Sequence, residues 1–428
     1  LPQYGRGTFL LSDTLNTGVA LEKSFRSGMA VASSLSVGRL AHSALTLPAK
    51  RAMSSLTVVL PLAGGRGGGA AVGNERAAER SYDASRLDRD HVSARVVRDA
   101  TVAYWQYVGA DERLRIYKET EARAERLVAE TEVLIRADER PASDLDLMAG
   151  NLASAQAARV AAEQIRLEAR YSLGLAMGLT AATIAALGPP STPFPAPEDV
   201  SGRGPREVIV RTALAKRRDL AAARTRRNGA RMAWEGAVRD LRPRWDVVGG
   251  IGHMSISSAL LGGDLLEPPP GSGTGLNASV QVRYAPTATN SAVQGAALRA
   301  DVAHRTATVV AEDLARRVRA NALVAAEALD NAMRETSIAA EALRLSQRAV
   351  ETEREKFRLG LATVFDAILA EDTLTKALLR RTDARLRYAV ALARLRFETG
   401  TLLRVSAGSV AADSDAALGF DLPEDQSQ

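Results

Sequence analysis

"EKFRLGLATVFDAILAED", residues 355–372, decides the fold, because it interrupts a long helical stretch and then restarts it. Helix-forming residues run into Gly360, which permits the left-handed backbone conformation that ends many helices. Thr363 is placed to cap a returning helix, and Asp366 follows three residues later, as in a capping box. The stretch therefore predicts a tight turn between a long helix and a helix that runs back along it.

A second break of the same kind lies in the first half of the chain. The breaks at 137–155 and 358–376 align with an offset of 220 residues, and the matched pairs are Pro141–Leu361, Ser143–Thr363, Leu145–Phe365 and Asp146–Asp366. The helical stretches that follow the breaks close at Gly178 and Gly400, an offset of 222 residues. This order and spacing predict two internal repeats that arose by gene duplication.

The helical stretches before the breaks are very long. Residues 70–137 and 291–359 would each form a helix of roughly 100 Å at about 1.5 Å per residue, and shorter return helices are predicted at 143–178 and 363–400. Such helices do not fit a compact globular domain, so we expect coiled coils or the wall of a tube. The predicted division is a first repeat at 1–190, a Pro-rich linker at 191–204, a second repeat at 205–403 and a C-terminal tail at 404–428.

The second repeat opens with a predicted helix at 205–240, which Pro243 must end. Leu1-Pro2-Gln3-Tyr4 matches the end of that segment, Arg242-Pro243-Arg244-Trp245. We therefore expect that the matching first helix, together with any export signal, is absent from this sequence.

Short strands are predicted next to both long helices. The second repeat offers "WDVVGGIGHMSIS" and "LNASVQVRY" within 244–286, and the first offers "YGRGTFLLS", "TGVALEKSF", "GMAVASSLSVGRL" and "SSLTVVLPL". Small apolar and polar residues alternate weakly, as in a transmembrane β-barrel strand or a soluble hairpin, and the strands alone leave both readings open. One chain has too few strands to close a barrel, so several chains would have to contribute.

Composition excludes several function classes. The chain has no Cys, which rules out disulfides and thiol chemistry, and it has no run of 18 apolar residues that would predict a transmembrane helix. Its 56 Lys and Arg alternate with 50 Asp and Glu along the helices, which favours a solvated helix surface over nucleic acid binding. No metal-ligand spacing occurs among the histidines, His42, His91, His253 and His304.

No enzyme or cofactor signature emerges either. "LPLAGGRGGGAAVG" stands between a strand and a helix but lacks the Gly-Lys-Ser/Thr ending of a phosphate loop, so we interpret it as a structural turn. The aromatic cluster Tyr104, Trp105 and Tyr107 is interpreted as packing rather than a stacking platform. The sequence thus predicts no enzymatic activity, no cofactor and no metal.

The order of these elements resembles the TolC-type outer membrane efflux factors over nearly the whole chain. The most specific pieces are "LGLATVFDAILAEDTL", "LTVVLPLAGGRG" and "KRRDLAAARTRRNGARMAW", and Arg140 stands where a Gly would be typical. The resemblance implies a mainly α fold with β: a homotrimer whose long antiparallel helices form an α-barrel tunnel, and whose chains give four strands each to one transmembrane β-barrel. It also implies a periplasmic adaptor and an inner membrane pump as partners, with outer membrane lipid around the barrel.

The resemblance gives the turn residues two functional readings. Asp366 could be only a first-turn charge favoured by the helix dipole, whereas the family places Asp near the pore constriction, where three copies would form an acidic ring. The candidates for that ring are Asp146, Asp366, Asp144, Asp372 and, more weakly, Glu371. The expected adaptor-docking tip consists of Pro141, Ala142, Ser143, Gly360, Leu361, Ala362 and Thr363, which also serve as plain turn residues.

The sequence therefore predicts a passive outer membrane duct for efflux or type I secretion, with helices projecting into the periplasm. Two alternatives stay open: a soluble coiled-coil scaffold decorated by β-hairpins, and an Arg-rich nucleic acid binder. A detergent requirement would separate the duct from both, and strongly salt-dependent DNA binding would favour the last.

Overall fold

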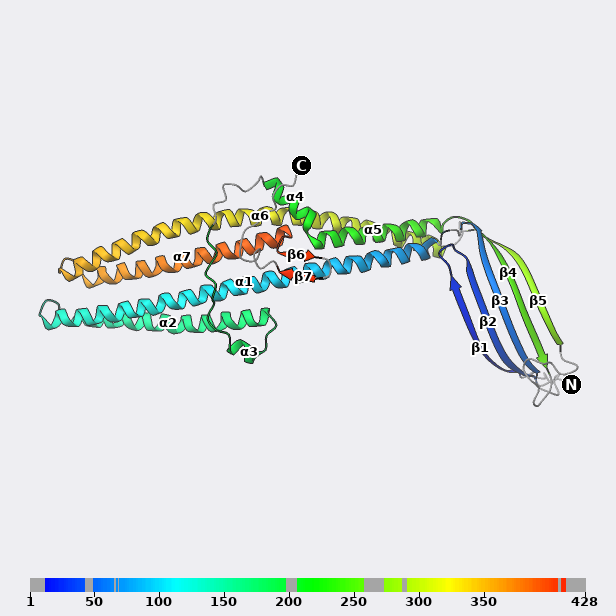
Figure 1. Cartoon of the computed structure of the whole chain (residues 1–428), viewed down its shortest axis with the longest axis horizontal. Helices are drawn as coiled ribbons and strands as arrows, with labels where there is room; N and C mark the ends of the chain where they lie inside the picture. The colour runs from blue at the N-terminus through cyan, green and yellow to red at the C-terminus, as the bar shows by residue number, and fades with distance from the viewer. Residues whose placement is uncertain are drawn as a thin grey trace, which may run out of the picture. The chain divides into compact units, whose positions relative to one another are not determined.

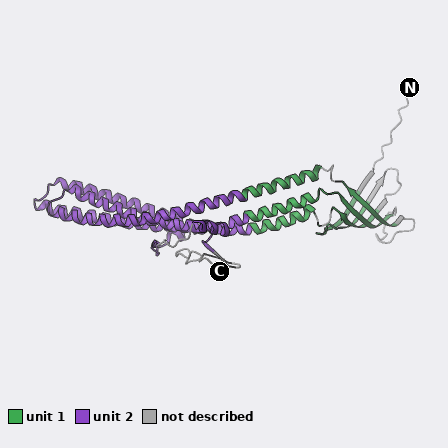
Figure 2. Ribbon diagram, turned by 90° about the horizontal axis from the view of Figure 1, so that it is seen from above, with its two compact units in different colours: residues 1–84, 223–310 green, residues 85–222, 311–428 purple. Residues whose placement is uncertain are grey.

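The computed structural model describes residues 12–42, 49–64, 67, 69–197, 206–257, 273–286, 291–406 and 409–412. Helices and strands are labelled in Figure 1. The chain divides into two compact units, coloured separately in Figure 2. The first comprises Leu1–Ala84 with Ala223–Val310, and the second comprises Ser85–Ala222 with Ala311–Gln428.

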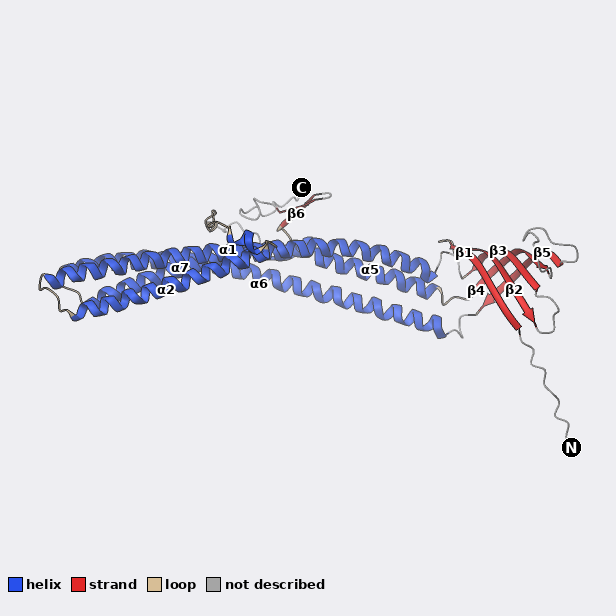
Figure 3. Cartoon of the chain, turned by 90° about the horizontal axis from the view of Figure 1, so that it is seen from below, coloured by secondary structure: helices blue, strands red, loops and turns tan. Residues whose placement is uncertain are grey.

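The first unit contains one antiparallel sheet, drawn in red in Figure 3. Its strands lie in the order of the chain: β1 (Ser12–Ser24), β2 (Ala30–His42), β3 (Ala49–Ala63), β4 (Arg244–Ser257) and β5 (Gly273–Ala285). The prediction of four strands per chain was therefore wrong for the sheet, which has five in the described residues. The additional strand is β1, which pairs with β2 along its full length. The candidate strand "YGRGTFLLS" lies outside the described residues except for Ser12.

The two faces of this sheet differ in polarity. Cross-strand partners share a face, and side chains alternate between faces along each strand. One face carries large apolar side chains that are exposed, chiefly Leu15, Val19, Leu21, Leu35, Leu56, Leu60, Ile251, Leu276, Val280 and Val282. The other face carries mostly small and polar residues, among them Ser34, Ser55, Thr57, Gly250, Asn277 and Ser279.

The first unit also holds the start of helix α1 (Gly69–Arg136) against α5 (Arg218–Arg239). A Cβ on Gly73 would lie 2.8 Å from the Met232 carbonyl oxygen, so these helices approach too closely for a side chain there. The Ala70 amide donates to the Asp240 carboxylate at 3.0 Å. The Ala70 amide, at the start of α1, is thus bonded to the chain's own Asp240, and residues 65, 66 and 68 of the glycine-rich junction lie outside the described residues.

The second unit is helical. It contains the remainder of α1, then α2 (Ser143–Ala176), α3 (Ala181–Ala185) and α4 (Arg206–Lys216), most of α6 (Ser291–Arg358), and α7 (Val364–Thr399). Many buried side chains along these helices are alanines, which let the helices pack closely; one core cluster consists of Ala325, Ala326, Leu329, Ala332, Tyr388, Ala391, Leu392 and Leu395. No described helix is apolar enough over a sufficient length to cross a membrane.

The single helix predicted at 205–240 is two helices, α4 and α5, which meet at Arg217. Arg217 is buried at this junction and pairs with Asp219 at 2.7 Å and with Glu398 at 2.5 Å. Gly400, whose φ is +70°, lies so close to the Lys216 backbone that an added Cβ would be 2.9 Å from it. The break is therefore fixed by contacts with the end of α7, which sequence alone does not reveal.

The segment after α2 packs back onto α1. Trp105 and Tyr107 are buried, Trp105 stacks on Phe194 with a ring separation of 5.8 Å, and the Tyr107 hydroxyl donates to the Gly188 carbonyl at 3.0 Å. The Thr192 amide donates to the Tyr104 hydroxyl at 3.2 Å. The aromatic residues thus contribute to packing, as predicted.

In the predicted tail, β6 (Leu403–Ser406) and β7 (Ser409–Ala412) form a short hairpin that was not predicted.

Candidate functional site

The candidate site lies at the two helical turns of the second unit, α1–α2 and α6–α7 (Figure 1). In the second turn, Gly360 has φ +71° and ends α6 in the left-handed conformation. The Leu361 amide donates to the Lys356 carbonyl at 2.8 Å, and the Gly360 amide donates to the Phe357 carbonyl at 3.1 Å. This is the Schellman pattern, and it confirms the predicted role of Gly360.

Helix α7 begins with the predicted capping box. The Asp366 amide donates to the Thr363 hydroxyl at 3.2 Å, and the Thr363 amide donates to the Asp366 carboxylate at 2.9 Å. The Thr363 hydroxyl also donates to that carboxylate at 2.6 Å. These bonds to the exposed carboxylate, from the hydroxyl first and the amide second, hold the pKa of Asp366 below its usual value. Asp366 is therefore both a capping group and a solvent-facing negative charge.

The first turn reaches a similar shape with different residues. Asp138 takes the left-handed conformation with φ +59°, and the Glu139 amide donates to the Leu134 carbonyl at 2.9 Å. Ser143 is already inside α2, and its preceding residue Ala142 occupies the N-cap position without a side-chain hydrogen bond. Arg140 can thus replace the typical Gly because Asp138 supplies the left-handed residue.

Arg140 joins the two turns. Its guanidinium donates to the Ala362 carbonyl at 2.7 Å and lies 4.6 Å from the centre of the Phe357 ring. It also approaches the Asp144 carboxylate at 4.0 Å. The Arg140 guanidinium therefore bonds to a carbonyl of the second turn and lies near the Asp144 carboxylate of the first turn. Arg140 and Ala362 are 222 residues apart in the chain, so local sequence patterns cannot predict this hydrogen bond.

An apolar cluster lies beneath the two turns and draws on all four helices. Leu127 of α1, Met148 of α2, Phe357 of α6, and Val364 of α7 are buried against one another. This cluster fixes both turns as one rigid support, because displacing one helix would expose apolar surface on the other three.

The predicted acidic residues fall into two groups. Asp146 and Asp366 are exposed in the first turns of α2 and α7. The others have basic partners: Asp144 lies near Arg140, and Asp372 pairs with Lys376 at 2.5 Å. Glu371 is buried between Arg123 of α1 at 2.9 Å and Arg354 of α6 at 2.5 Å. Of the acids predicted for the ring, Asp146, Asp366 and the paired Asp372 are thus exposed. Asp138 and Glu139 of the first turn are exposed acids as well.

The turns also present apolar side chains to solvent. Leu361 and Phe365 are 74% and 63% exposed, and Leu359 and Leu147 are exposed beside them. Of the predicted docking residues, Pro141, Ser143, Gly360 and Thr363 are exposed as well, whereas Ala362 is buried. The sequence pattern predicted Leu361 as a docking residue but not Phe365 or Leu359, although both are apolar and flank the turn.

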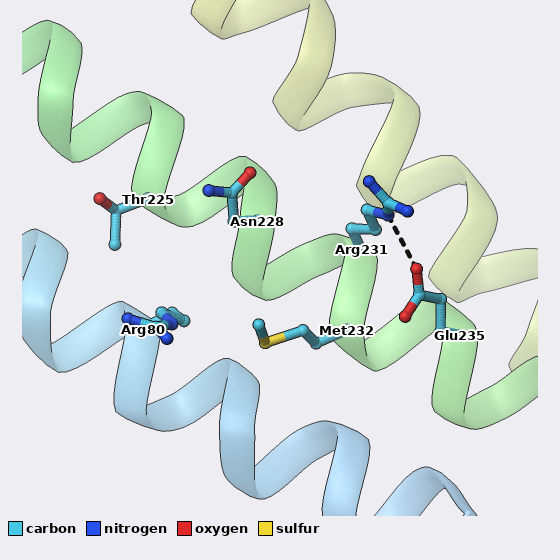
Figure 4. Close-up of a pocket in the computed structure, with 6 residues that line it drawn as sticks. All are labelled: Arg80, Thr225, Asn228, Arg231, Met232 and Glu235. Atoms are coloured by element: carbon cyan, nitrogen blue, oxygen red, sulfur yellow. Dashed lines mark hydrogen bonds and ion pairs between the residues drawn. The ribbon is translucent and has the colours of Figure 1, made fainter.

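An open groove of about 500 Å³ lies between α1 and α5 in the first unit (Figure 4). Arg80 faces it from α1, while α5 contributes Thr225, Asn228, Arg231, Met232 and Glu235. Its charged groups are paired: Arg80 with Asp83 at 3.4 Å and Arg231 with Glu235 at 2.7 Å. Across the described ranges, no group of three or more His, Asp or Glu could hold a metal ion.

No protein-family model and no curated protein matches the chain. Solved structures do match it. The outer-membrane channel OprN has a TM-score of 0.70 with 16% identity, over 91% of this chain and 82% of that one. The transmembrane channel CusC has a TM-score of 0.69 with 14% identity, over 91% and 83%. The outer membrane protein VceC from Vibrio cholerae has a TM-score of 0.68 with 14% identity, over 91% and 87%.

These likenesses cover nearly the whole described chain at low identity, so they establish its fold. The chain has the fold of outer membrane channels, and the expected resemblance to TolC-type proteins is confirmed at that level.

Proposed function

We propose that this chain is the subunit of a passive outer membrane channel, a duct for efflux or type I secretion that carries out no chemistry of its own. The sheet would lie in the outer membrane and the helices would project into the periplasm. An inner membrane pump would supply the energy through a periplasmic adaptor. The proposal includes no cofactor, no metal and no nucleic acid.

The main observation that supports this proposal is the exposed apolar face of the sheet. Val19, Leu276 and Val280 are each more than 70% exposed, and they stand on a face to which each of the five strands contributes exposed apolar side chains. Soluble proteins rarely expose so large a contiguous apolar surface, whereas a transmembrane β-strand needs one face toward lipid and a polar face toward the lumen. The strands have 13 to 15 residues, enough to span a bilayer when tilted.

A single chain leaves this sheet open. Within the described sheet, β1 and β5 each have one neighbour, and bare strand edges are not tolerated in hydrocarbon. The proposed assembly is a homotrimer in which the sheets of three chains form one closed barrel and the helices form an α-barrel tunnel. Helices α1 and α6 of 68 residues each, followed by α2 and α7 of 34 and 36 residues, support two structural repeats in each chain.

The two turns then have the roles that the resemblance implies. Three copies of Asp366 and of Asp146 would form acidic rings at the tunnel constriction, with Asp144 and Asp372 as secondary candidates. Pro141, Ser143, Gly360, Leu361 and Thr363 would meet the adaptor. The exposed Leu361 and Phe365 give such a surface the apolar contact area that a docking site requires.

Single-channel conductance in a planar bilayer tests the proposal. Reconstituted protein should give discrete, cation-selective openings. Changing Asp366→Asn together with Asp146→Asn removes the proposed ring charges while the Asn side chain can still accept the capping hydrogen bonds. We expect this variant to lose cation selectivity and block by multivalent cations.

The control is Glu341→Gln on α6, an exposed acid paired with Arg344, which should leave selectivity unchanged. No conductance from any variant would argue against a channel. Conductance with selectivity that the double variant does not alter would argue against the acidic rings alone.

A further inference from the structure

The exposed apolar face does not stop at the four strands expected for this fold. In β1, Leu15, Val19 and Leu21 are 68%, 76% and 74% exposed. The residues between them, such as Ala20 and Glu22, are small or polar and lie on the other face. β1 therefore has the alternation of a strand with one wet and one apolar side.

The register makes this apolar face continuous with that of the neighbouring strands. Val19 is the partner of Leu35 in β2, and Leu21 is the partner of Ser33, which in turn pairs with Leu56 of β3. Leu56 pairs with Ile251 of β4. Because cross-strand partners share a face, the apolar side chains of β1 extend the surface formed by β2 to β5.

The polar face is continuous as well. Ala20 is the partner of Ser34, whose hydroxyl hydrogen-bonds to that of Ser55 in β3 at 2.8 Å. Ser55 pairs with Gly252, and Gly252 pairs with Asn277. β1 thus continues both faces of the sheet, in which it is an edge strand as β5 is.

The β1–β2 turn lies at the helical end of the sheet. Arg26 pairs with Glu75 of α1 at 2.5 Å, and the Gly67 amide donates to the Ser27 carbonyl at 3.2 Å. The end of β1 is therefore tied to the junction where β3 leads into α1. From this junction, the 13 residues of β1 extend about 43 Å along the strand. At the usual strand tilt this corresponds to about 30 Å along the bilayer normal, which exceeds the apolar band of about 25 Å in transmembrane barrels.

Aromatic residues mark the same end of the sheet on β1 and on β4–β5. The Trp245 and Tyr284 rings lie 4.5 Å apart, tilted by 38°, and are about half exposed, and Phe25 at the β1–β2 turn is also exposed. Trp, Tyr and Phe gather at the membrane–water interface of transmembrane barrels. The aromatic girdle of this sheet thus includes the end of β1.

We infer that β1 is a fifth transmembrane strand of each chain, in contact with the hydrocarbon of the bilayer through Leu15, Val19 and Leu21. The inference rests on the proposed function, since it assigns lipid contact to a sheet that the proposal places in the membrane. Three copies would then supply at least fifteen strands instead of twelve, and because barrel diameter grows roughly linearly with strand number, the opening would be about a quarter wider.

Lipid-phase quenching of single labelled cysteines tests this inference, and the absence of native Cys makes each introduced thiol unique. Val19→Cys and Ala20→Cys report the two faces of β1, and Val280→Cys and Ser279→Cys report the two faces of β5. Each variant is labelled with a bimane and placed in phosphatidylcholine vesicles with or without doxyl-labelled phosphatidylcholine. We expect quenching about twofold or more stronger at Val19 than at Ala20, and the same ratio between Val280 and Ser279, because alternate residues face lipid.

Two negative results are distinguishable. Quenching at Val280 without quenching at Val19 would overturn the fifth transmembrane strand and leave the membrane sheet in place. No quenching at either valine would overturn the proposed function, and the inference with it. Retention of the sheet in each variant is checked by its circular dichroism, since Cys for Val or Ala is a small change in volume.

Discussion

Thr363 and Ser143 occupy matched positions in the two turns, yet only Thr363 caps a helix. Thr363→Ala removes the hydroxyl that accepts from the Asp366 amide, so we expect the free energy of unfolding to fall by about 1 kcal/mol. Ser143→Ala is the matched control and should change it little, because no capping bond is lost. Urea unfolding followed by circular dichroism measures both. Equal losses for the two variants would contradict the observed capping.

His91 gives the second unit a dependence on pH. Its ring packs 5.4 Å from that of Phe397, with Nδ1 3.8 Å from the Asp219 carboxylate. Burial lowers the pKa of His91, and Arg217 and Arg95 add to this, against the attraction of Asp219 and Asp88. Since the unfolded chain then binds the proton more tightly, stability is fully present above the unfolded pKa of about 6.5 and falls as the pH drops below it.

We therefore expect the melting temperature of the wild type to fall between pH 7.5 and pH 5.5. His91→Phe keeps an aromatic ring beside Phe397 and removes the titrating group, so its melting temperature should fall less over the same range. Differential scanning calorimetry at both pH values measures the difference. An unchanged pH dependence in this variant would mean that another group is responsible.

The structure of the two helical turns could be predicted from sequence only where hydrogen-bond partners lie close together along the chain. Gly360, Thr363 and Asp366 each hydrogen-bond to a partner three residues away along the chain, so a local pattern was sufficient to predict their roles. Arg140 could only be recognised as an unusual residue, because its acceptor Ala362 lies on the other turn. Asp138 was missed because a non-Gly residue with positive φ has no clear sequence signal.

Two glycines have opposite effects on helix stability: Gly360 ends a helix, whereas Gly150 lies inside one. Gly360 ends α6 with φ +71°, so Gly360→Ala should destabilise the protein by about 1–2 kcal/mol through backbone strain. Gly150 lies inside α2, and nothing lies within 4 Å of an added Cβ. Gly150→Ala should stabilise by about 0.5–1 kcal/mol. The two substitutions should move the urea midpoint in opposite directions, and a shift of the same sign would contradict the assigned helix ends.

The long helices were the most predictable elements, because apolar spacing, Gly and Pro mark their limits. α1 extends over Gly69–Arg136 where 70–137 was predicted, and α6 over Ser291–Arg358 where 291–359 was predicted. The sheet was less predictable. The alternation in residues 12–42 predicted candidate strands there, and that segment resembled a family variant with extra β-structure, although the resemblance implied four barrel strands per chain. The pairing of β1 with β2 gives a sheet of five strands in the described residues.

Several surfaces of this protein indicate an assembly of more than one chain. An apolar sheet face, open strand edges and exposed apolar residues at the helical turns are surfaces that lipid, further copies and a partner protein would cover. Low-identity likeness to outer membrane channels establishes the fold, whereas assembly is a property of surfaces that must be measured.

The most direct measurement is the molar mass of the protein in detergent, by light scattering corrected for bound detergent. We expect a mass close to three chains, and precipitation when the detergent is removed, because the apolar sheet face would then be exposed to water. A monodisperse monomer or dimer that stays soluble in plain buffer would contradict the trimeric channel and favour a soluble coiled-coil scaffold.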